Sequence, residues 1–239
     1  MSNAAVEVPK DDCSLWPINQ NQPVVMGLDL AFHSDRSVLA QCQVFRTMGR
    51  DVVGFFSIHR FDKGELPDAV ADFTVRQMQR YSHPFCIFDV TSDPTFASVL
   101  ASRFASKPAN YLMAASITQA AECDAFPHPM MCSARGRPVA LPKVSLAKSA
   151  IITGIATEMR GLTVAFTETG DGPQLREELK NYQRNVRASG SVQYTAPPGQ
   201  TDDTVMAVAM ALHAARTYAQ PRRNVTRQRR PTPGVQAWT

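Results

Sequence analysis

The chain has 239 residues and a mass of 26.3 kDa; 44% of its residues are hydrophobic and 19% are charged. A chain of this length and composition can bury a sizeable core, which excludes a wholly disordered or fibrous protein. It contains no run of about 18 apolar residues and no apolar core typical of a secretory signal near its start, so we expect a cytoplasmic protein without a membrane partner.

The formal net charge of +4 originates at one end of the chain. Residues 221–239 contain five arginines and no acidic residue, and removing these five charges from +4 leaves −1 for the rest. These arginines are Arg222, Arg223, Arg227, Arg229 and Arg230. We therefore predict a flexible basic tail over residues 220–239 that contacts an anionic partner, nucleic acid being the natural candidate; a merely solubilising end is the alternative.

Five cysteines without paired short spacing predict reduced thiols rather than a disulfide scaffold or a zinc site. One cluster, Cys123, His128 and Cys132, offers three possible metal ligands in a proline-rich stretch. It has no recognisable fourth ligand, so spacing alone is weak evidence for a metal there.

The first half of the chain predicts a sheet crossed by helices. Residues 1–22 lack apolar periodicity and are expected to be a flexible leader, followed by one domain over residues 23–219. Three apolar runs separated by turns predict an antiparallel meander, and the following segments alternate between helical and strand patterns. The expected strands are 24–32, 37–45, 51–60, 85–90 and 111–117, and the expected helices are 65–81 and 94–104.

The second half begins with an irregular stretch, residues 118–142, that could be a long loop or an inserted hairpin. Helices are then expected over 143–160, 173–187 and 201–218, with strands over 162–166 and 192–195. The succession predicts an α/β fold: a mixed sheet of five or six strands, the first three antiparallel, with helices on both faces.

Acidic residues stand at three places where an apolar element would not require them. Asp29 interrupts an apolar strand, Asp89 ends another, and Asp202 and Asp203 open the apolar last helix. Each has a local explanation, because Asp29 could form a turn, Asp89 could cap the next helix, and an aspartate at a helix start is favoured by capping and by the helix dipole.

Taken together, these carboxylates predict a cation site, because the two strand ends and the helix start can meet at one edge of a mixed sheet. Carboxylate oxygens suit Mg²⁺ or Mn²⁺. Two such ions about 3.5 to 4 Å apart can activate water and stabilise the leaving oxygen in phosphodiester cleavage.

The order of three motifs resembles the RNase H-like nuclease domain of the large terminase subunit of tailed bacteriophages. They are Gly27-Leu-Asp-Leu-Ala31, Phe88-Asp89, and Gly199-Gln-Thr-Asp-Asp-Thr-Val-Met-Ala207. The resemblance spans about residues 23 to 219, and Gln200 stands where the family frequently has histidine. No single motif is specific; the succession carries the resemblance.

The resemblance implies an RNase H-like fold and a metal-dependent endonuclease that cleaves double-stranded DNA with two Mg²⁺ or Mn²⁺ ions. It implies that Asp29, Asp89 and Asp203 are the catalytic metal ligands, with Asp202 as a cap or supporting acid. Asp35 could approach the second metal or be a solvated turn residue. Lys143, expected at a loop-to-helix boundary, could meet a DNA phosphate.

The chain departs from that family because it contains no phosphate-binding GxxxxGK[ST] motif, which an ATPase motor requires. We therefore expect either an excised domain or a separately encoded nuclease that works with a motor, a portal and a small terminase subunit in the host cytoplasm. Three alternatives stay open: a Holliday-junction-resolvase-like or other RNase H-like nuclease, an actin-like ATPase, and a non-catalytic adaptor that binds DNA or a portal.

Overall fold

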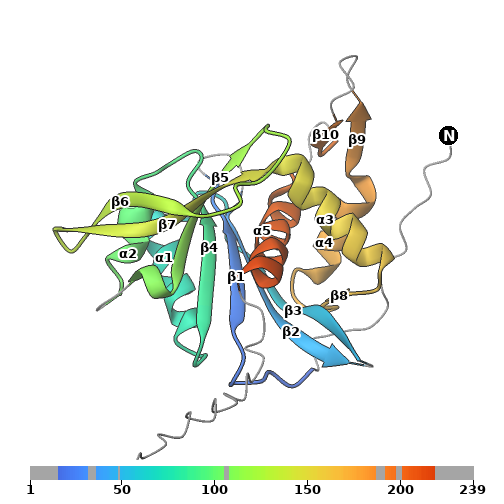
Figure 1. Ribbon diagram of the computed structural model, residues 1–239, viewed down its shortest axis with the longest axis horizontal. Helices are drawn as coiled ribbons and strands as arrows, with labels where there is room; N and C mark the ends of the chain where they lie inside the picture. Colours follow the sequence, from blue (N-terminus) through green and yellow to red (C-terminus); the bar gives the residue numbers. More distant parts are fainter. Residues whose placement is uncertain are drawn as a thin grey trace, which may run out of the picture.

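The computed structural model describes residues 16–31, 36–47, 49–104, 108–186, 192–197 and 201–218. Its strands are β1 (Val24–Asp29), β2 (Val38–Thr47), β3 (Arg50–Arg60), β4 (Pro84–Asp89), β5 (Leu112–Thr118), β6 (His128–Ala134), β7 (Arg137–Ala147), β8 (Val164–Phe166), β9 (Gln183–Val186) and β10 (Val192–Thr195). Its α-helices are α1 (Pro67–Met78), α2 (Phe96–Ala101), α3 (Lys148–Arg160), α4 (Gly172–Asn181) and α5 (Asp203–Thr217) (Figure 1). A short 3-10 helix, Pro108–Asn110, precedes β5.

Among the described residues, eight strands form one mixed sheet in the order β6-β7-β5-β4-β1-β2-β3-β8, and β9 and β10 form a separate pair. Strands β1, β2 and β3 are antiparallel, whereas β4 lies parallel to β1 on its other side. The predicted mixed sheet and its antiparallel first three strands are confirmed. The predicted strand number is wrong, because β6 and β7 extend the sheet to eight.

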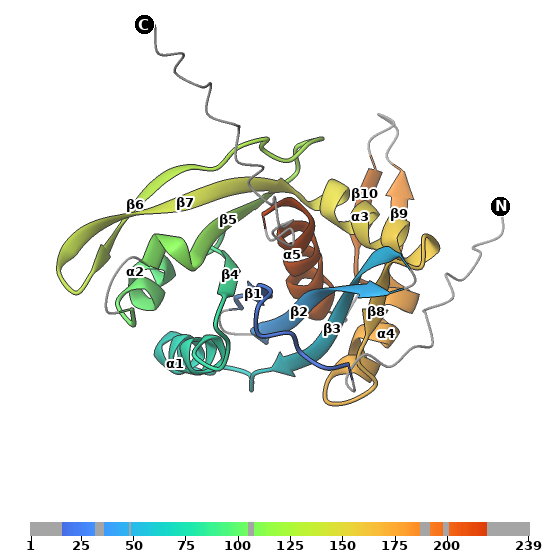
Figure 2. The same cartoon turned by 60° about the horizontal axis from the view of Figure 1, so that its bottom comes forward.

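Helices cover both faces of the sheet, as predicted (Figure 2). Helices α3 and α5 pack on the face that contains Val25 and Ile87, while α1 and α2 pack on the face that contains Met26 and Phe88. Nearly all of α5 is buried, which explains why this helix is apolar around its whole circumference. Among the described residues, no helix is long and apolar enough to cross a membrane.

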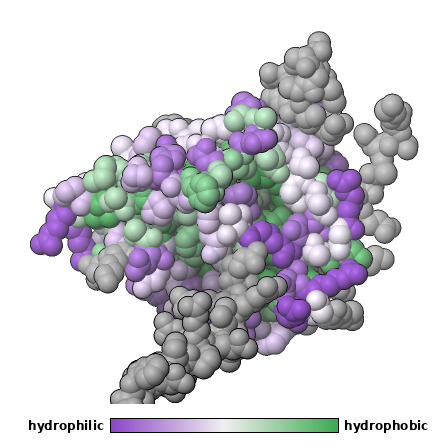
Figure 3. All heavy atoms as spheres, in the orientation of Figure 1, coloured by the Kyte–Doolittle hydropathy of each residue, from purple (hydrophilic) through white to green (hydrophobic). Residues whose placement is uncertain are grey.

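The stretch predicted as a loop or hairpin contains the hairpin β6–β7. Its turn is made by Arg135 and Gly136, which both have positive φ, at 53° and 74°. Such a turn matches the twist of paired strands. Hydrophilic residues gather at the hairpin tip, where Arg135 and Arg137 are exposed (Figure 3).

The helix predicted over 143–160 is wrong in its first five residues, which form the end of β7. Buried Val144 and Leu146 alternate with the more polar Lys143 and Ser145, the period of two that a strand requires. Lys143 therefore lies within a strand, and the first residue of the helix is Lys148. The helix predicted over 173–187 likewise ends at Asn181, before β9.

Candidate functional site

Asp29 is the last residue of β1 and faces α5. Side chains alternate along a strand, so Asp29 projects on the same side as Gly27, two residues earlier. A Cβ on Gly27 would lie 2.8 Å from the backbone nitrogen of Ala211 and still closer to the carbonyl oxygen of Ala207. The helix thus crosses β1 at the contact distance that only glycine permits, and its first turn lies beside Asp29.

Asp89 ends the neighbouring strand β4. Leu28 pairs with Phe88 in the parallel register, so the next residues, Asp29 and Asp89, end adjacent strands at the same edge of the sheet. The main-chain nitrogen of Thr91 donates a hydrogen bond to Asp89 Oδ1 at 2.8 Å, and the Thr91 hydroxyl donates to the same oxygen. The prediction that Asp29 and Asp89 lie on adjacent strands is confirmed.

Asp203 is brought to this edge by the start of α5. The main-chain nitrogen of Arg36, two residues before β2, donates to Asp203 Oδ2 at 3.4 Å, and the first residue of β2, Val38, pairs with Asp29. Asp203 is buried, with 8% of its surface exposed. Strand β2 and helix α5 therefore place Asp203 next to the end of β1.

Mutual repulsion links these carboxylates electrostatically. The pKa of Asp29 is raised well above its usual value, first by burial and then by the negative charges of Asp89, Asp203 and Asp202, while Lys148 opposes the rise. Burial also raises the pKa of Asp89, against the hydrogen bonds from Thr91. Three neighbouring carboxylates thus disfavour the charge of Asp29, and a cation bound among them would offset that repulsion.

Lys148 and Tyr182 hold Asp202. The Lys148 ammonium donates to Asp202 Oδ2 at 2.7 Å, and the Tyr182 hydroxyl donates to the same oxygen at 2.7 Å. Burial and the charge of Asp202 raise the pKa of Tyr182, which keeps the hydroxyl proton in place. Neither Lys148 nor Tyr182 was predicted from the sequence to belong to the site. Lys148 could have been predicted only if β7 had been known to end at Ala147, directly before it.

Lys143 does not stand where it was predicted. It pairs with Ala114, whose side chain belongs to the core under α1 and α2, so Lys143 projects to the face opposite Asp29 and Asp89. Its predicted position at a helix start is wrong, and the contact with DNA that rested on it stays a prediction. Asp35 and the five arginines of the tail lie outside the described residues.

Within the described ranges, no group of three or more His, Cys, Asp or Glu side chains is arranged so that it could hold a metal ion. The cluster of Cys123, His128 and Cys132 considered from the sequence is therefore not arranged as a metal site either. Cys123 packs against the α5 side of the sheet and Cys132 against the α1 side, so the sheet separates their thiols.

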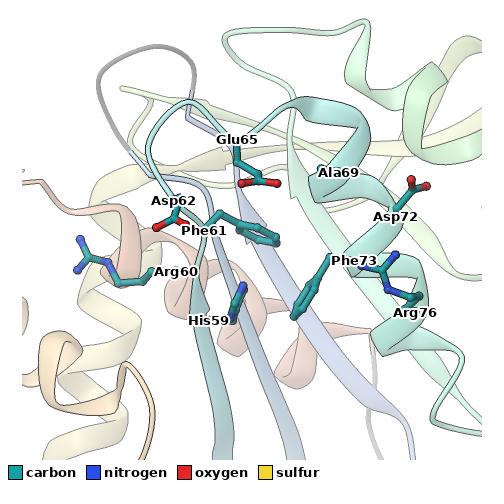
Figure 4. Close-up of a pocket in the computed structure, with 9 residues that line it drawn as sticks. All are labelled: His59, Arg60, Phe61, Asp62, Glu65, Ala69, Asp72, Phe73 and Arg76. Carbon is teal, nitrogen blue, oxygen red and sulfur yellow. The ribbon is translucent and has the colours of Figure 1, made fainter.

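A pocket of about 610 Å³ lies between the end of β3 and α1. His59 stacks on Phe73 with ring centroids 4.3 Å apart, and Phe61 meets both rings edge-on. Figure 4 shows these three rings on one side of β3 and the side chain of Arg60 on the other. Arg60 is also among the lining residues of the pocket, but the aromatic wall lies on the α1 face of the sheet, opposite Asp29 and Asp89.

Solved structures of terminase nucleases resemble this chain in fold. The large terminase nuclease of thermophilic phage G20c with bound magnesium has a TM-score of 0.56 at 16% identity, covering 80% of this chain and 81% of that one. The P22 large terminase nuclease domain gives 0.54 at 11%, with 89% and 92% covered. The human cytomegalovirus terminase nuclease domain, manganese-soaked and inhibitor-bound, gives 0.52 at 10%, with 85% and 88% covered.

No family model matches the chain, and no curated protein matches its sequence. Identities this low establish the fold alone. The predicted fold class is confirmed on that basis: the chain has the RNase H-like fold of the large terminase nuclease domains.

Proposed function

We propose that this chain is a metal-dependent endonuclease that cleaves double-stranded DNA, as the nuclease part of a viral DNA-packaging terminase. The observation that carries the proposal is the placement of Asp29, Asp89 and Asp203 at one edge of the sheet, near enough that the charges of Asp89 and Asp203 raise the pKa of Asp29. The related nucleases with bound magnesium or soaked with manganese support the same class of cofactor.

The donor chemistry fits Mg²⁺ or Mn²⁺, because both prefer carboxylate oxygens. When bound, such ions would lower the pKa of a water molecule and stabilise the leaving oxygen of a phosphodiester. Asp29, Asp89 and Asp203 would be the catalytic ligands, and binding would require them to turn toward one point against their repulsion. Asp35 would be a candidate ligand for a second ion.

Asp202 has a supporting role in this proposal. Its Oδ2 already accepts hydrogen bonds from Lys148 and Tyr182, which favours Asp203 as the ligand of the two. By fixing the residue before α5, Lys148 and Tyr182 orient the first turn of the helix and hence Asp203. The ammonium of Lys148 also offsets part of the negative charge that Asp29 meets.

The direct test is cleavage of supercoiled plasmid in Mg²⁺ or Mn²⁺, with a chelator and with Asp29→Ala as controls. We expect nicked and linear DNA that disappears in both controls. DNA binding without cleavage would instead favour the non-catalytic adaptor, and a strong preference for four-way junctions over linear duplex would favour a resolvase.

The basic tail is proposed to contact DNA phosphates without reading bases. Removal of residues 221–239 should weaken duplex binding at any sequence and make its salt dependence shallower, by up to about 0.9 log units per log salt for each lost contact. Binding is measured by fluorescence anisotropy over a salt series. Cleavage at low salt and high DNA concentration should survive, because Asp29, Asp89 and Asp203 precede the deletion.

An unchanged affinity and salt slope after the deletion would contradict a DNA-binding role of the tail. Docking to a packaging partner such as the motor, the portal or the small terminase subunit would then be the better explanation of its charge.

A further inference from the structure

Arg60 ends β3 on the same face of the sheet as the carboxylates. Asp29 pairs with Val38 of β2, and Val38 pairs with Arg60, so the three residues form one row across three strands. Neighbouring strands lie about 4.8 Å apart, which puts the Cα of Arg60 about 10 Å from that of Asp29. Arg60 therefore flanks the carboxylate cluster on the β3 side, whereas Lys148 approaches it from α3.

The backbone of Arg60 is fixed by a hydrogen bond, whereas its guanidinium makes only a long ion pair, with Nη2 4.0 Å from Oε1 of Glu178. The main-chain nitrogen of Arg60 donates to Asp171 Oδ2 at 2.9 Å, which ties the end of β3 to the start of α4. In the part of the chain that the structure describes, no acceptor takes a hydrogen bond from the guanidinium, and the buried Nε has no partner. The side chain is 20% exposed, so solvent and a ligand can reach it.

Glu178 is the nearest opposite charge, yet its oxygens are already occupied. The hydroxyl of Thr204 donates to Oε1 at 2.8 Å and the main-chain nitrogen of Val205 donates to Oε2 at 3.2 Å, so Glu178 holds the start of α5. Arg60 Nη2 stands 4.0 Å from Oε1, beyond hydrogen-bonding distance. The charge of Glu178 thus holds the Arg60 guanidinium in place, but Glu178 accepts no hydrogen bond from it.

We propose that the guanidinium of Arg60 binds a backbone phosphate of the DNA strand, beside the phosphate that the carboxylates would attack. This inference rests on the proposed function. Arginine presents five N–H donors in a rigid fork that matches phosphate oxygens, and such contacts set the register of a duplex without reading its sequence. Figure 4 shows the Arg60 side chain on the other side of β3 from the rings of His59, Phe61 and Phe73, which agrees with the strand register that puts it on the face of Asp29.

The test compares Arg60→Gln with Arg50→Gln, a matched control at the exposed opposite end of the same strand. Binding of a labelled duplex is measured by fluorescence anisotropy with a chelator present, so that cleavage does not interfere. We expect Arg60→Gln to weaken binding about tenfold and to make the salt slope shallower by about 0.9. Arg60→Lys should restore the slope but not the full affinity, and Arg50→Gln should change neither.

A second background separates phosphate binding from a structural role. If Arg60 serves only to balance Glu178, Arg60→Gln will have no effect on DNA affinity once Glu178→Gln is also present, and the proposal is overturned. A phosphate contact requires the same loss in both backgrounds. The Glu178→Gln background also keeps the test valid if an unbalanced Glu178 destabilises the fold of the single variant.

The two proposals fail differently. If the unmodified protein neither binds nor cleaves duplex DNA, the proposed function is wrong. If it does bind and Arg60→Gln equals Arg50→Gln in affinity and salt slope, only the role of Arg60 is wrong.

Discussion

Replacing Asp29 by asparagine is expected to abolish metal-dependent plasmid cleavage while the protein stays as stable as before or becomes more stable. The amide cannot supply the anionic oxygen that a divalent cation requires, so activity should fall at least about 10³-fold, equivalent to about 4 kcal/mol. Stability should be retained because the variant removes a charge that Asp89, Asp203 and Asp202 repel. Cleavage rates and melting temperatures are measured side by side.

The sign of the pH dependence follows from the raised pKa of Asp29. A folded-state pKa above the unfolded one means that the folded state binds more protons, so stability falls as pH rises from the unfolded pKa through the folded pKa. In chelator, the stability advantage of Asp29→Asn should thus be largest above the folded pKa and shrink toward lower pH.

Asp51→Asn, at the opposite end of β3 from Arg60, is the matched control: it removes only an exposed ion pair with Arg46, so activity should be unchanged and the melting temperature should change little. Strong destabilisation by Asp29→Asn would mean that Asp29 is a structural carboxylate held by hydrogen bonds, and the catalytic proposal would lose its central residue.

Replacing Gly27 by alanine is expected to destabilise the protein severely, by about 3 kcal/mol or more, because the added Cβ would overlap the backbone of α5 at Ala207 and Ala211. Backbone atoms of a buried helix cannot move aside as the end of a flexible side chain can. Any protein that still folds should have α5 displaced from β1, and with it Asp203 from Asp29. Denaturant unfolding and plasmid cleavage measure the two effects.

Gly154→Ala is the control for this substitution. Gly154 lies in the interior of α3, where an added Cβ meets nothing within 4 Å, so alanine should stabilise the helix by about 0.5 to 1 kcal/mol. A Gly27→Ala variant with unchanged unfolding free energy would contradict the close approach of α5 to β1.

The local patterns of the sequence predicted much of the fold because the first strands and the last helix obey simple periodicities. The alternating strands of the meander and the uniformly apolar α5 could each be placed from a single segment. Asp29 and Asp89 could be singled out for the same reason, since a carboxylate in an apolar strand contradicts its surroundings.

Strand β7 could not be placed in this way. Pro138 and Pro142 suggested an irregular loop, but these prolines pair with Ser133 and Pro129 of β6, and the strand's pairing with β5 begins only at Lys143. Because the end of β7 was misplaced, the lysine expected at the start of the helix was Lys143, whereas the structure has Lys148 there. Long-range pairing decided the outcome, and a local window of sequence does not contain it.

The role inferred for Arg60 was invisible for a related reason. In the sequence it is one of many arginines, and only the register of β1, β2 and β3 puts it in line with Asp29. Likewise, the contact of Lys148 with Asp202 joins residues 54 positions apart. Site residues such as Arg60 and Lys148 can be identified only when it is known which strand ends lie at the same edge of the sheet.

The packing of α5 on β1 has a consequence for the order in which the protein can mature during synthesis. Strand β1 cannot make its contacts with α5 until α5 has been synthesised, because Gly27 packs against Ala207 and Ala211, about 180 residues later in the chain. Contacts so distant along the chain form late, because closing a long loop costs entropy before any contact offsets it.

Until α5 emerges, the face of the sheet that includes Val25 and Ile87 lacks its cover, so the nascent chain would expose apolar surface and need protection from aggregation. Asp203 is the first residue of the same helix, so the proposed carboxylate site cannot be complete before α5 has been synthesised.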